Sequence, residues 1–359
     1  MTGVLVATRV SRNAAGRRRR AAVALAAVVG VAVAVYGISR LGDAAGGGPV
    51  RPGQAGGSAR PSELLVLQVV GTDEPLLAVI GTRVGGRHPA FFSVPFDLTL
   101  TVPGQGDVMA AEVADLDADT VRVAVSNTFG AWAEHVAVLG LDGLSAVVDR
   151  GGGLRVHVPG FYVTAAGDLG PGPMRLSGAQ VVALLELDVE GGEARWGSVV
   201  QALLQTRVRI GEADLAGSDG LVGVRRVLRA ARGAASAAFP TTSVAESVTV
   251  PLQPDLDRAV AQRFGFAPAV PVIVQNGVGA PGLGQDVAAA LLPLGFRVVL
   301  TQNADVFGYE RTRVIANGGG AVADARRIRD ALGVGRVGVS QVPSGIGDIT
   351  IIVGEDFTG

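Results

Sequence analysis

The chain has 359 residues, 48% of them hydrophobic and 18% charged, so it is long enough for two domains with their own cores beyond any anchor. A formal net charge of -1 provides no positive field that would attract nucleic acid, and all 31 basic residues are arginines. Without lysine, Walker-type phosphate loops and Schiff-base chemistry are excluded, and without cysteine so are disulfides, thiolate zinc sites and cysteine nucleophiles. The scattered histidines His88, His135 and His157 show no spacing typical of a metal cluster or a catalytic triad.

Residues 21–38 (AAVALAAVVGVAVAVYGI) contain no charged side chain. At about 1.5 Å per residue, a helix of this length covers roughly 27 Å, close to the thickness of the hydrocarbon core of a bilayer. Four arginines at 17–20 precede it and only Arg40 follows directly, which predicts that residues 1–20 are cytoplasmic and the chain beyond the helix is extracytoplasmic. We therefore expect a single-pass protein of the cell membrane. A cleaved signal peptide is the alternative, and it would export the same part of the chain.

Residues 39–62 are rich in Gly, Ala, Pro and Ser, a composition that predicts a flexible linker. From Glu63 on, the apolar runs LLVLQVV, PLLAVIG and AFFSVPFDLTLTV have the length of strands, and HVAVLGL is a further strand candidate. Longer apolar spacings predict helices over residues 120–129, 140–148, 176–188 and 195–205. Two more helices are predicted from VRRVLRAARGAASAAF and PLQPDLDRAVAQRFGF, the second of which ends a domain at 63–266. This mixture predicts an α/β layer architecture.

The last ninety residues are divided more sharply by glycines and prolines. Strands are predicted for VPVIVQN, FRVVLTQ, TRVIAN and DITIIVG, and helices for QDVAAALLPLG and AVADARRIRDALG. The order β-α-β-β-α-β predicts a small sandwich in which two helices cover one face of a sheet. We place this second domain at residues 269–357.

Several separate motifs in this tail resemble the LytR C-terminal domain, a module of Gram-positive cell-envelope proteins. They are NGVGAPGLG after a strand, LLPLGFRV, TRVI, AVADARRI and the ending DITIIVGEDF. The resemblance implies a location in the cell envelope and assigns no chemistry.

Residues 63–266 resemble a degenerate LytR-CpsA-Psr (LCP) domain of α/β/α architecture. Members of that family transfer glycans from a polyprenyl-pyrophosphate carrier to peptidoglycan, with a divalent metal and arginines that hold the pyrophosphate. The family's serine-hydrophobe-proline-arginine-aspartate motif corresponds to SVPFD here, so Asp97 remains while Phe96 replaces the arginine. In SGAQVVALLELDVEGGEARWGS, Glu186 and Asp188 stand at arginine positions, Arg195 matches a later arginine, and Ser198 replaces its partner. Each reversed charge would repel the substrate by about 1–4 kcal/mol per close pair.

The resemblance also implies a residual magnesium site at Asp73 and Asp97, although we expect these aspartates to bind backbone amides when no phosphate is present. We expect no cofactor, and magnesium only if the chain is an active enzyme. In that alternative, the chain would be a glycopolymer phosphotransferase whose phosphate clamp is rebuilt from arginines such as Arg83, Arg87 or Arg175.

Two further patterns carry a structural and a functional interpretation. Gly277, Gly279 and Gly282 have G-x-G-x-x-G spacing, but a module of ninety residues lacks the second half of a dinucleotide-binding fold, so we expect Asn276 and Gly277 to form a turn. A weaker hypothesis is that the amides of Asn276–Gly284, including Gly284 itself, bind an anionic group of a wall polymer. Arg225, Arg226, Arg229 and Arg232 lie on one side of a predicted helix, which we expect to be a solvated face rather than a contact with anionic lipid or polymer.

The sequence thus favours a membrane-anchored, extracytoplasmic accessory or scaffold protein, a catalytically inactive LCP relative. Its expected partner is a cell-wall glycopolymer or an envelope protein, and nucleic acid is excluded. The active phosphotransferase remains the alternative, and a pure tether without any ligand pocket is a third possibility.

Overall fold

The computed structural model describes residues 62–72, 76–82, 88–113, 116–187, 189, 191–206, 209–218, 220–245, 248–342 and 344–358. The predicted cytoplasmic segment, membrane helix and linker lie outside these residues except for Ser62 at the end of the linker, which is buried and donates to the carbonyl of Thr82. Within them, no helix has both the length and the apolar character needed to cross a bilayer. The described residues belong to one compact unit, Gly48–Gly359, which contains two modules.

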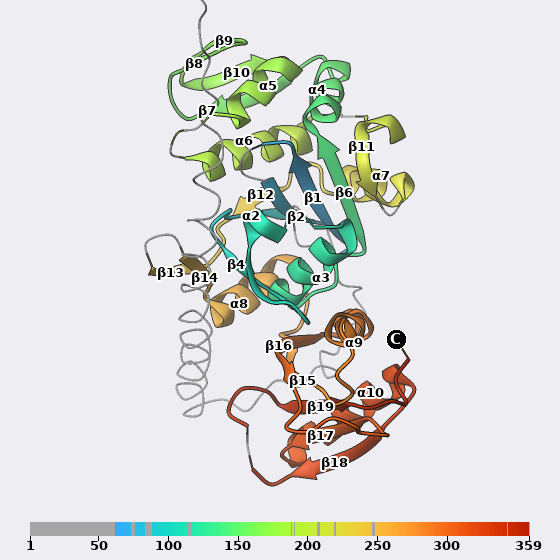
Figure 1. The fold of residues 1–359 in the computed structure, drawn as a ribbon. Helices are drawn as coiled ribbons and strands as arrows, with labels where there is room; N and C mark the ends of the chain where they lie inside the picture. The colour runs from blue at the N-terminus through green and yellow to red at the C-terminus, as the bar shows by residue number, and fades with distance from the viewer. Residues whose placement is uncertain are drawn as a thin grey trace, which may run out of the picture. The chain divides into compact units, whose positions relative to one another are not determined.

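A six-stranded mixed sheet forms the centre of the first module (Figure 1). The central strand β1 pairs in antiparallel fashion with β2, with Leu64 opposite Gly81, and in parallel with β6, with Val66 opposite Val136. The strands, in their order across the sheet, are β11 (Leu215–Ser218), β6 (His135–Gly140), β1 (Leu64–Val70), β2 (Leu76–Gly81), β3 (Ala90–Val94) and β12 (Ala235–Ala237).

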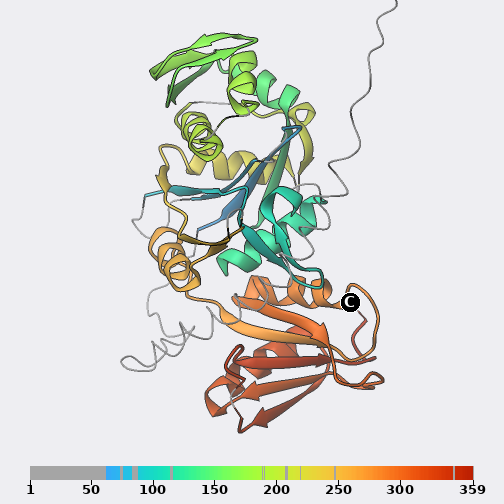
Figure 2. The same cartoon turned by 60° about the vertical axis from the view of Figure 1, so that its left-hand side comes forward.

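Both faces of this sheet are buried, because β1 is apolar at odd and even positions alike. Leu65, Leu67 and Val69 enter one core, and Leu64 and Val66 enter the other. The first core is covered by α4 (Leu141–Arg150), α5 (Gly178–Leu185), α6 (Gly192–Gln205) and α7 (Leu221–Ala230), and the second by α3 (Ala118–Phe129) and α8 (Gln253–Phe264). Helices therefore lie on both sides of the sheet (Figure 2), which confirms the predicted α/β architecture.

Local sequence signals set the ends of several helices. Asp117 caps α3 by accepting hydrogen bonds from the amides of Asp119 and Thr120, and these bonds lower the pKa of its carboxyl. Ser177 and Gln180 form a reciprocal capping box at the start of α5. These caps fix where α3 and α5 begin.

Two elements differ from the sequence prediction. The arginine-rich helix α7 stops at Ala230, and Ala235–Ala237 form strand β12 beside β3 instead of continuing the helix. Gly233, with a φ of 72°, redirects the chain, and its amide donates to the carbonyl of Leu204. The run AFFSVPFDLTLTV is also two strands, because residues 96–97 form a turn between β3 and β4.

Small β-hairpins and one short helix complete the first module. They are β4 (Thr99–Val102) with β5 (Gly106–Met109), α2 (Ala110–Val113), β7 (Leu154–Val158) with β10 (Gly172–Leu176), β8 (Tyr162–Thr164) with β9 (Gly167–Leu169), and β13 (Thr241–Ala245) with β14 (Val248–Pro251).

The second module is a five-stranded sheet with α9 (Leu283–Leu291) and α10 (Val322–Leu332) sharing one core. Its strand order is β16 (Phe296–Asn303), β15 (Val270–Asn276), β19 (Ile349–Val353), β17 (Arg313–Asn317) and β18 (Arg336–Ser340). The sequence predicted four of these strands and missed β18. This edge strand contains Gly338 and buries no residue, so it lacks the alternation that identifies a half-buried strand.

Polar side chains join the two modules at the C-terminal end of α3. The carboxamide of Asn127 donates to the carbonyl of Val298 at 2.8 Å and accepts from its amide at 2.8 Å, as a neighbouring strand would. Arg297 donates to both carboxylate oxygens of Asp257 on α8, at 2.5 and 3.1 Å. Gly130 leaves room for this guanidinium, because a Cβ there would lie 2.4 Å from its Nη2. The modules therefore meet through fixed, directional hydrogen bonds.

Candidate functional site

The SVPFD segment lies where β3 ends, and its aspartate is held by β14. The Oδ2 of Asp97 accepts a hydrogen bond of 2.6 Å from the hydroxyl of Thr249, and the Thr249 amide donates to the Asp97 carbonyl at 3.2 Å. Asp73, the second aspartate of the predicted metal site, lies outside the described residues. Among the residues that are described, no group of three or more His, Asp or Glu side chains is arranged to hold a metal ion.

A second carboxylate near Asp97 belongs to Glu193, at the beginning of α6. Partial desolvation, followed by the charge of Asp97, raises the pKa of Glu193. The hydroxyl oxygen of Ser93 would lie 3.2 Å from a Cβ on Gly197, so the end of β3 packs closely on this helix. The end of β3 therefore carries two carboxylates that interact electrostatically.

Arg195, which matches a family arginine, is directed away from this place. Its side chain is buried, and its Nη2 donates to the carbonyls of Leu187 at 2.7 Å and Val189 at 3.0 Å. The guanidinium also lies over the ring of Tyr162, 5.8 Å from its centroid. Arg195 thus fixes the connection between α5 and α6.

The remaining arginine positions supply no cation at Asp97 either. Glu186 is the C-terminal cap of α5, while Asp188 lies outside the described residues. Ser198 lines a different groove, between α6 and β7. Across the described part of the chain, no hydrogen bond or ion pair connects an arginine to Asp97.

The arginines proposed for a rebuilt clamp can be placed only in part. Arg83 and Arg87 lie outside the described residues. Arg175 is exposed on β10 and donates to the carbonyl of Gly152, so its guanidinium is engaged in the β7–β10 region.

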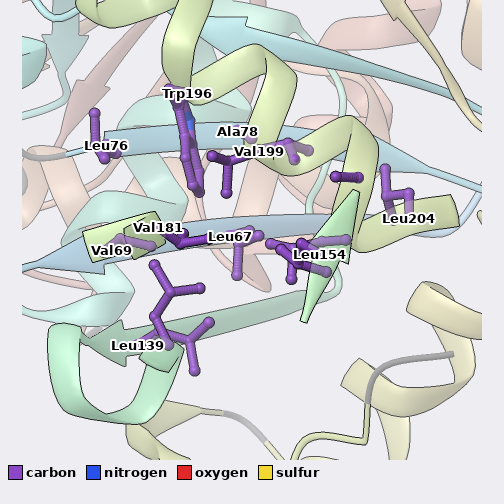
Figure 3. Packing of buried hydrophobic residues seen from close by; sticks show 14 of the residues in the cluster. Leu67, Val69, Leu76, Ala78, Leu139, Leu154, Val181, Trp196, Val199 and Leu204 are labelled. Atoms are coloured by element: carbon purple, nitrogen blue, oxygen red, sulfur yellow. The ribbon is translucent and has the colours of Figure 1, made fainter. Parts of the chain in front are cut away.

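The apolar space under α6 is filled by side chains. Trp196, Val199 and Leu204 of α6 meet Leu67 and Ala78 of the sheet in one packed layer (Figure 3). The remaining cavity measures about 10 Å³, with a wall that includes Leu67, Ile80, Leu139, Val200, Leu204 and Leu228. This is about the volume that one water molecule needs, so it has no room for a polyprenyl chain.

The glycine-rich loop of the second module is organised by its own asparagine. The Oδ1 of Asn276 accepts from the amides of Val278 at 3.1 Å and Gly279 at 2.8 Å, and its Nδ2 donates to Ala280. The Gly277 amide donates to the carbonyl of Val353. These three amides therefore have partners inside the module, and anion binding by this loop stays a prediction.

Close packing and backbone conformation account for the glycines of this loop. A Cβ on Gly277 would lie 2.6 Å from the Val353 carbonyl oxygen, and one on Gly284 would lie 2.9 Å from the Cα of Gly104 in the first module. Gly279 and Gly282 both have a φ of 87°, a conformation that favours glycine. Gly284 therefore lets the start of α9 approach the β4–β5 turn.

Arg225, Arg226 and Arg229 of α7 and Arg232 in the turn after it are exposed, as expected for a solvated face. Arg225 donates to the carbonyl of Ile210, and Arg226 forms an ion pair with Glu63 at 2.9 Å. The Nη2 of Arg226 also lies 3.4 Å from His135. Two of the four arginines thus make contacts within the module.

A polar groove that the sequence did not predict lies between β7 and α6. Its volume is about 210 Å³, and its wall contains Arg155, His157, Pro173, Ser198, Gln201 and Gln205. The alternation in LRVHV reveals the exposed side of β7, but its pairing with α6 depends on tertiary packing.

Comparison with known proteins agrees with the two resemblances. Residues 269–357 match the family described as LytR cell envelope-related transcriptional attenuator, which confirms the resemblance of the tail to the LytR C-terminal domain. No curated protein matches the chain.

Solved structures of similar fold include the putative transcriptional regulator ywtF from Bacillus subtilis. It has a TM-score of 0.50 and 15% sequence identity, over 61% of this chain and 97% of that chain. B. subtilis TagV has a TM-score of 0.49 and 12% identity, over 58% and 98% of the respective chains. The LytR-CPS2A-psr family protein YwtF (TagT) with bound octaprenyl pyrophosphate lipid has a TM-score of 0.46 and 15% identity, over 62% and 98%. At these identities the ywtF match concerns the fold alone, and it confirms an LCP-like fold before the LytR C-terminal module.

Proposed function

We propose that this chain is a membrane-anchored, extracytoplasmic accessory protein of the cell envelope that binds a wall glycopolymer or an envelope partner and transfers neither. The observation that carries the proposal is the charge at the end of β3. Partial burial, and after it the charge of Asp97, raises the pKa of Glu193 there, so the two carboxylates lie close enough to interact. A pyrophosphate at this place would be repelled by about 1–4 kcal/mol for each close pair of charges.

The packing under α6 supports the same proposal. An LCP-type phosphotransferase must hold a long apolar carrier, and TagT has been solved with octaprenyl pyrophosphate bound. The core between the sheet and α6 in this chain is packed, with a cavity of about 10 Å³. Opening it would separate Leu67, Val200 and Leu204 from their neighbours, at roughly 1.5–3 kcal/mol for each side chain exposed to water.

The rival function, an active phosphotransferase, is tested on the full chain purified in detergent with magnesium and octaprenyl pyrophosphate. Phosphate release and retained lipid are measured for the wild type and for Asp97→Ala. We expect neither release nor retention in either protein, with both folded by circular dichroism. Turnover by the wild type that is lost in Asp97→Ala would overturn the proposal and show that other arginines hold the phosphate.

A charge-restoring variant adds a test in which a gain of pyrophosphate binding is expected. Phe96→Arg combined with Glu193→Gln replaces a ring and a carboxylate with one cation. We expect affinity for soluble inorganic pyrophosphate to rise by about tenfold, because one repulsion is removed and one attraction is added. Unchanged affinity would mean that the electrostatics at Asp97 do not explain the loss of binding.

A further inference from the structure

The groove between the β7–β10 hairpin and α6 is built from two regular elements. On β7, Leu154, Val156 and Val158 are buried, so Arg155 and His157 between them face outward. On α6, Ser198, Gln201 and Gln205 follow one another at helical spacing along the same wall. Strand and helix therefore direct five polar side chains into one space of about 210 Å³.

The donors and acceptors of these five side chains are available to a ligand. Within the described part of the chain, Arg155, His157, Ser198, Gln201 and Gln205 have no hydrogen-bond or ion-pair partner. The wall also contains no acidic side chain. An isolated surface arginine commonly means only solubility, but this arginine stands among four other polar groups on a concave wall.

The hairpin keeps two like charges in register. Arg155 lies directly opposite Arg175, and His157 lies opposite Pro173. Like charges at directly opposed positions destabilise a hairpin. Arg175 donates to the carbonyl of Gly152, a neutral group, so no carboxylate compensates the pair. An anion held at Arg155 would relieve this repulsion.

The chemistry of the wall specifies the ligand class. A guanidinium binds phosphate oxygens through two parallel hydrogen bonds. A hydroxyl and two carboxamides offer donors and acceptors at once, which suits the hydroxyl groups of a sugar or polyol. The groove is smaller than the roughly 300–1,000 Å³ of sites for drug-sized ligands, so it fits a single repeat unit. From this we infer that the groove binds one phosphate-bearing polyol or sugar unit of an anionic glycan.

This inference rests on the proposed function and assigns polymer binding to a place other than the negatively charged end of β3. The groove begins at Ser198, more than one turn along α6 from Glu193. Binding there requires neither the missing phosphate clamp nor an open lipid cavity.

Calorimetric titration of the full chain in detergent with a glycerol phosphate oligomer tests the inference. We expect Arg155→Gln to weaken binding by about tenfold, because a charged hydrogen bond is lost, and Gln201→Ala to weaken it by about threefold. Arg229→Gln removes the same charge from the exposed face of α7 and should leave the affinity unchanged. All three residues are exposed, so none of the variants should unfold at a lower temperature, and Arg155→Gln should be slightly stabilised because its repulsion with Arg175 is removed.

The outcomes separate the two claims. Equal binding by the wild type and Arg155→Gln would overturn the groove while leaving polymer binding in place. No binding by the wild type would overturn the groove together with the glycopolymer part of the proposed function, and would leave an envelope partner as the ligand. Inorganic phosphate that binds as tightly as the oligomer would show a simple anion site and overturn the glycan assignment, whereas a clear preference for the oligomer over both phosphate and glycerol supports it.

Discussion

Arg297 and Arg195 are both almost fully buried, with 4% and 2% of their surfaces exposed, but their partners differ. Arg297 connects the two modules, where its guanidinium binds both oxygens of the Asp257 carboxylate and the carbonyl of Asn127. Arg195 stays within its own module and binds the carbonyls of Leu187 and Val189 beneath the Tyr162 ring.

The difference shows which arginine holds a larger part of the molecule in place. A guanidinium with a carboxylate partner has its charge compensated, and removing either partner leaves an uncompensated charge in a dry environment. A guanidinium that binds carbonyls loses only neutral hydrogen bonds when it is replaced by an apolar chain. The contact between the modules should therefore be more sensitive to substitution than the α5–α6 connection.

Asp257→Ala should give the largest loss of stability, because it leaves the buried guanidinium of Arg297 without its carboxylate partner. We expect a loss of about 3 kcal/mol in the free energy of unfolding. Urea unfolding followed by tryptophan fluorescence measures it, with Trp196 in the core of the first module and Trp132 packed against the core of the second. In single-tryptophan variants, the second module should unfold at a lower urea concentration than it does in the wild type.

Asp255→Ala is the matched control, since Asp255 lies on the same helix and its half-exposed carboxylate pairs with Arg258. It should cost less than about 1 kcal/mol. Equal losses of stability in the two variants would mean that the buried pair contributes no more than a surface pair, which would contradict the greater sensitivity expected for the module contact.

Much of the fold could be predicted because local signals decide it. LLVLQVV is apolar at every position but one, so it reads as a strand buried on both faces, and glycines mark the ends of α3, α8 and α10. Strand β18 was missed because it buries no side chain, and the end of α7 because alanines after Ala230 favour a helix until the sheet edge captures them.

The candidate sites, like the fold, could be predicted only where local sequence decides them. That Phe96 stands where the LCP resemblance places an arginine can be read from the sequence, and the structure adds which side chains lie near Asp97. That Glu193 lies near Asp97, and that Arg195 turns to Leu187, depends on how α6 packs. The polar groove and the contact of Asn127 with Val298 join segments far apart in the chain, and no local pattern encodes such pairings.

Arg195→Met tests how much the other buried arginine contributes to stability. The methionine keeps the apolar stem and removes the donors to Leu187 and Val189. We expect a loss of about 1–2 kcal/mol in the free energy of unfolding, smaller than for Asp257→Ala, because the hydrogen bonds to the two carbonyls are lost and no buried charge is created. Arg229→Met, at an exposed position of α7, should change it by less than about 0.5 kcal/mol. A loss greater than that of Asp257→Ala would show that the α5–α6 connection, not the module contact, limits stability.

Glu193→Gln should give the smallest effect and the one that depends most on pH. The pKa of Glu193 is raised above its ordinary value of 4.5, so the folded chain holds this proton more tightly than the unfolded chain does. Its stabilising contribution is complete below pH 4.5 and is lost as the pH rises through the folded pKa. Above its ordinary pKa Glu193 therefore lowers stability, and at pH 7 the glutamine variant should be more stable by less than about 1 kcal/mol.

Urea unfolding of the wild type and Glu193→Gln between pH 4 and pH 7 measures the difference, which should shrink toward zero at the acidic end. Glu355→Gln makes the same change of charge at an exposed position of the second module and should show no such trend. If the Glu193 variant were instead less stable at pH 7, the carboxylate would be a favourable partner of some cation at the end of β3. A phosphate clamp could then be present after all, so the sign of this small effect tests the same electrostatics on which the proposed loss of phosphate transfer depends.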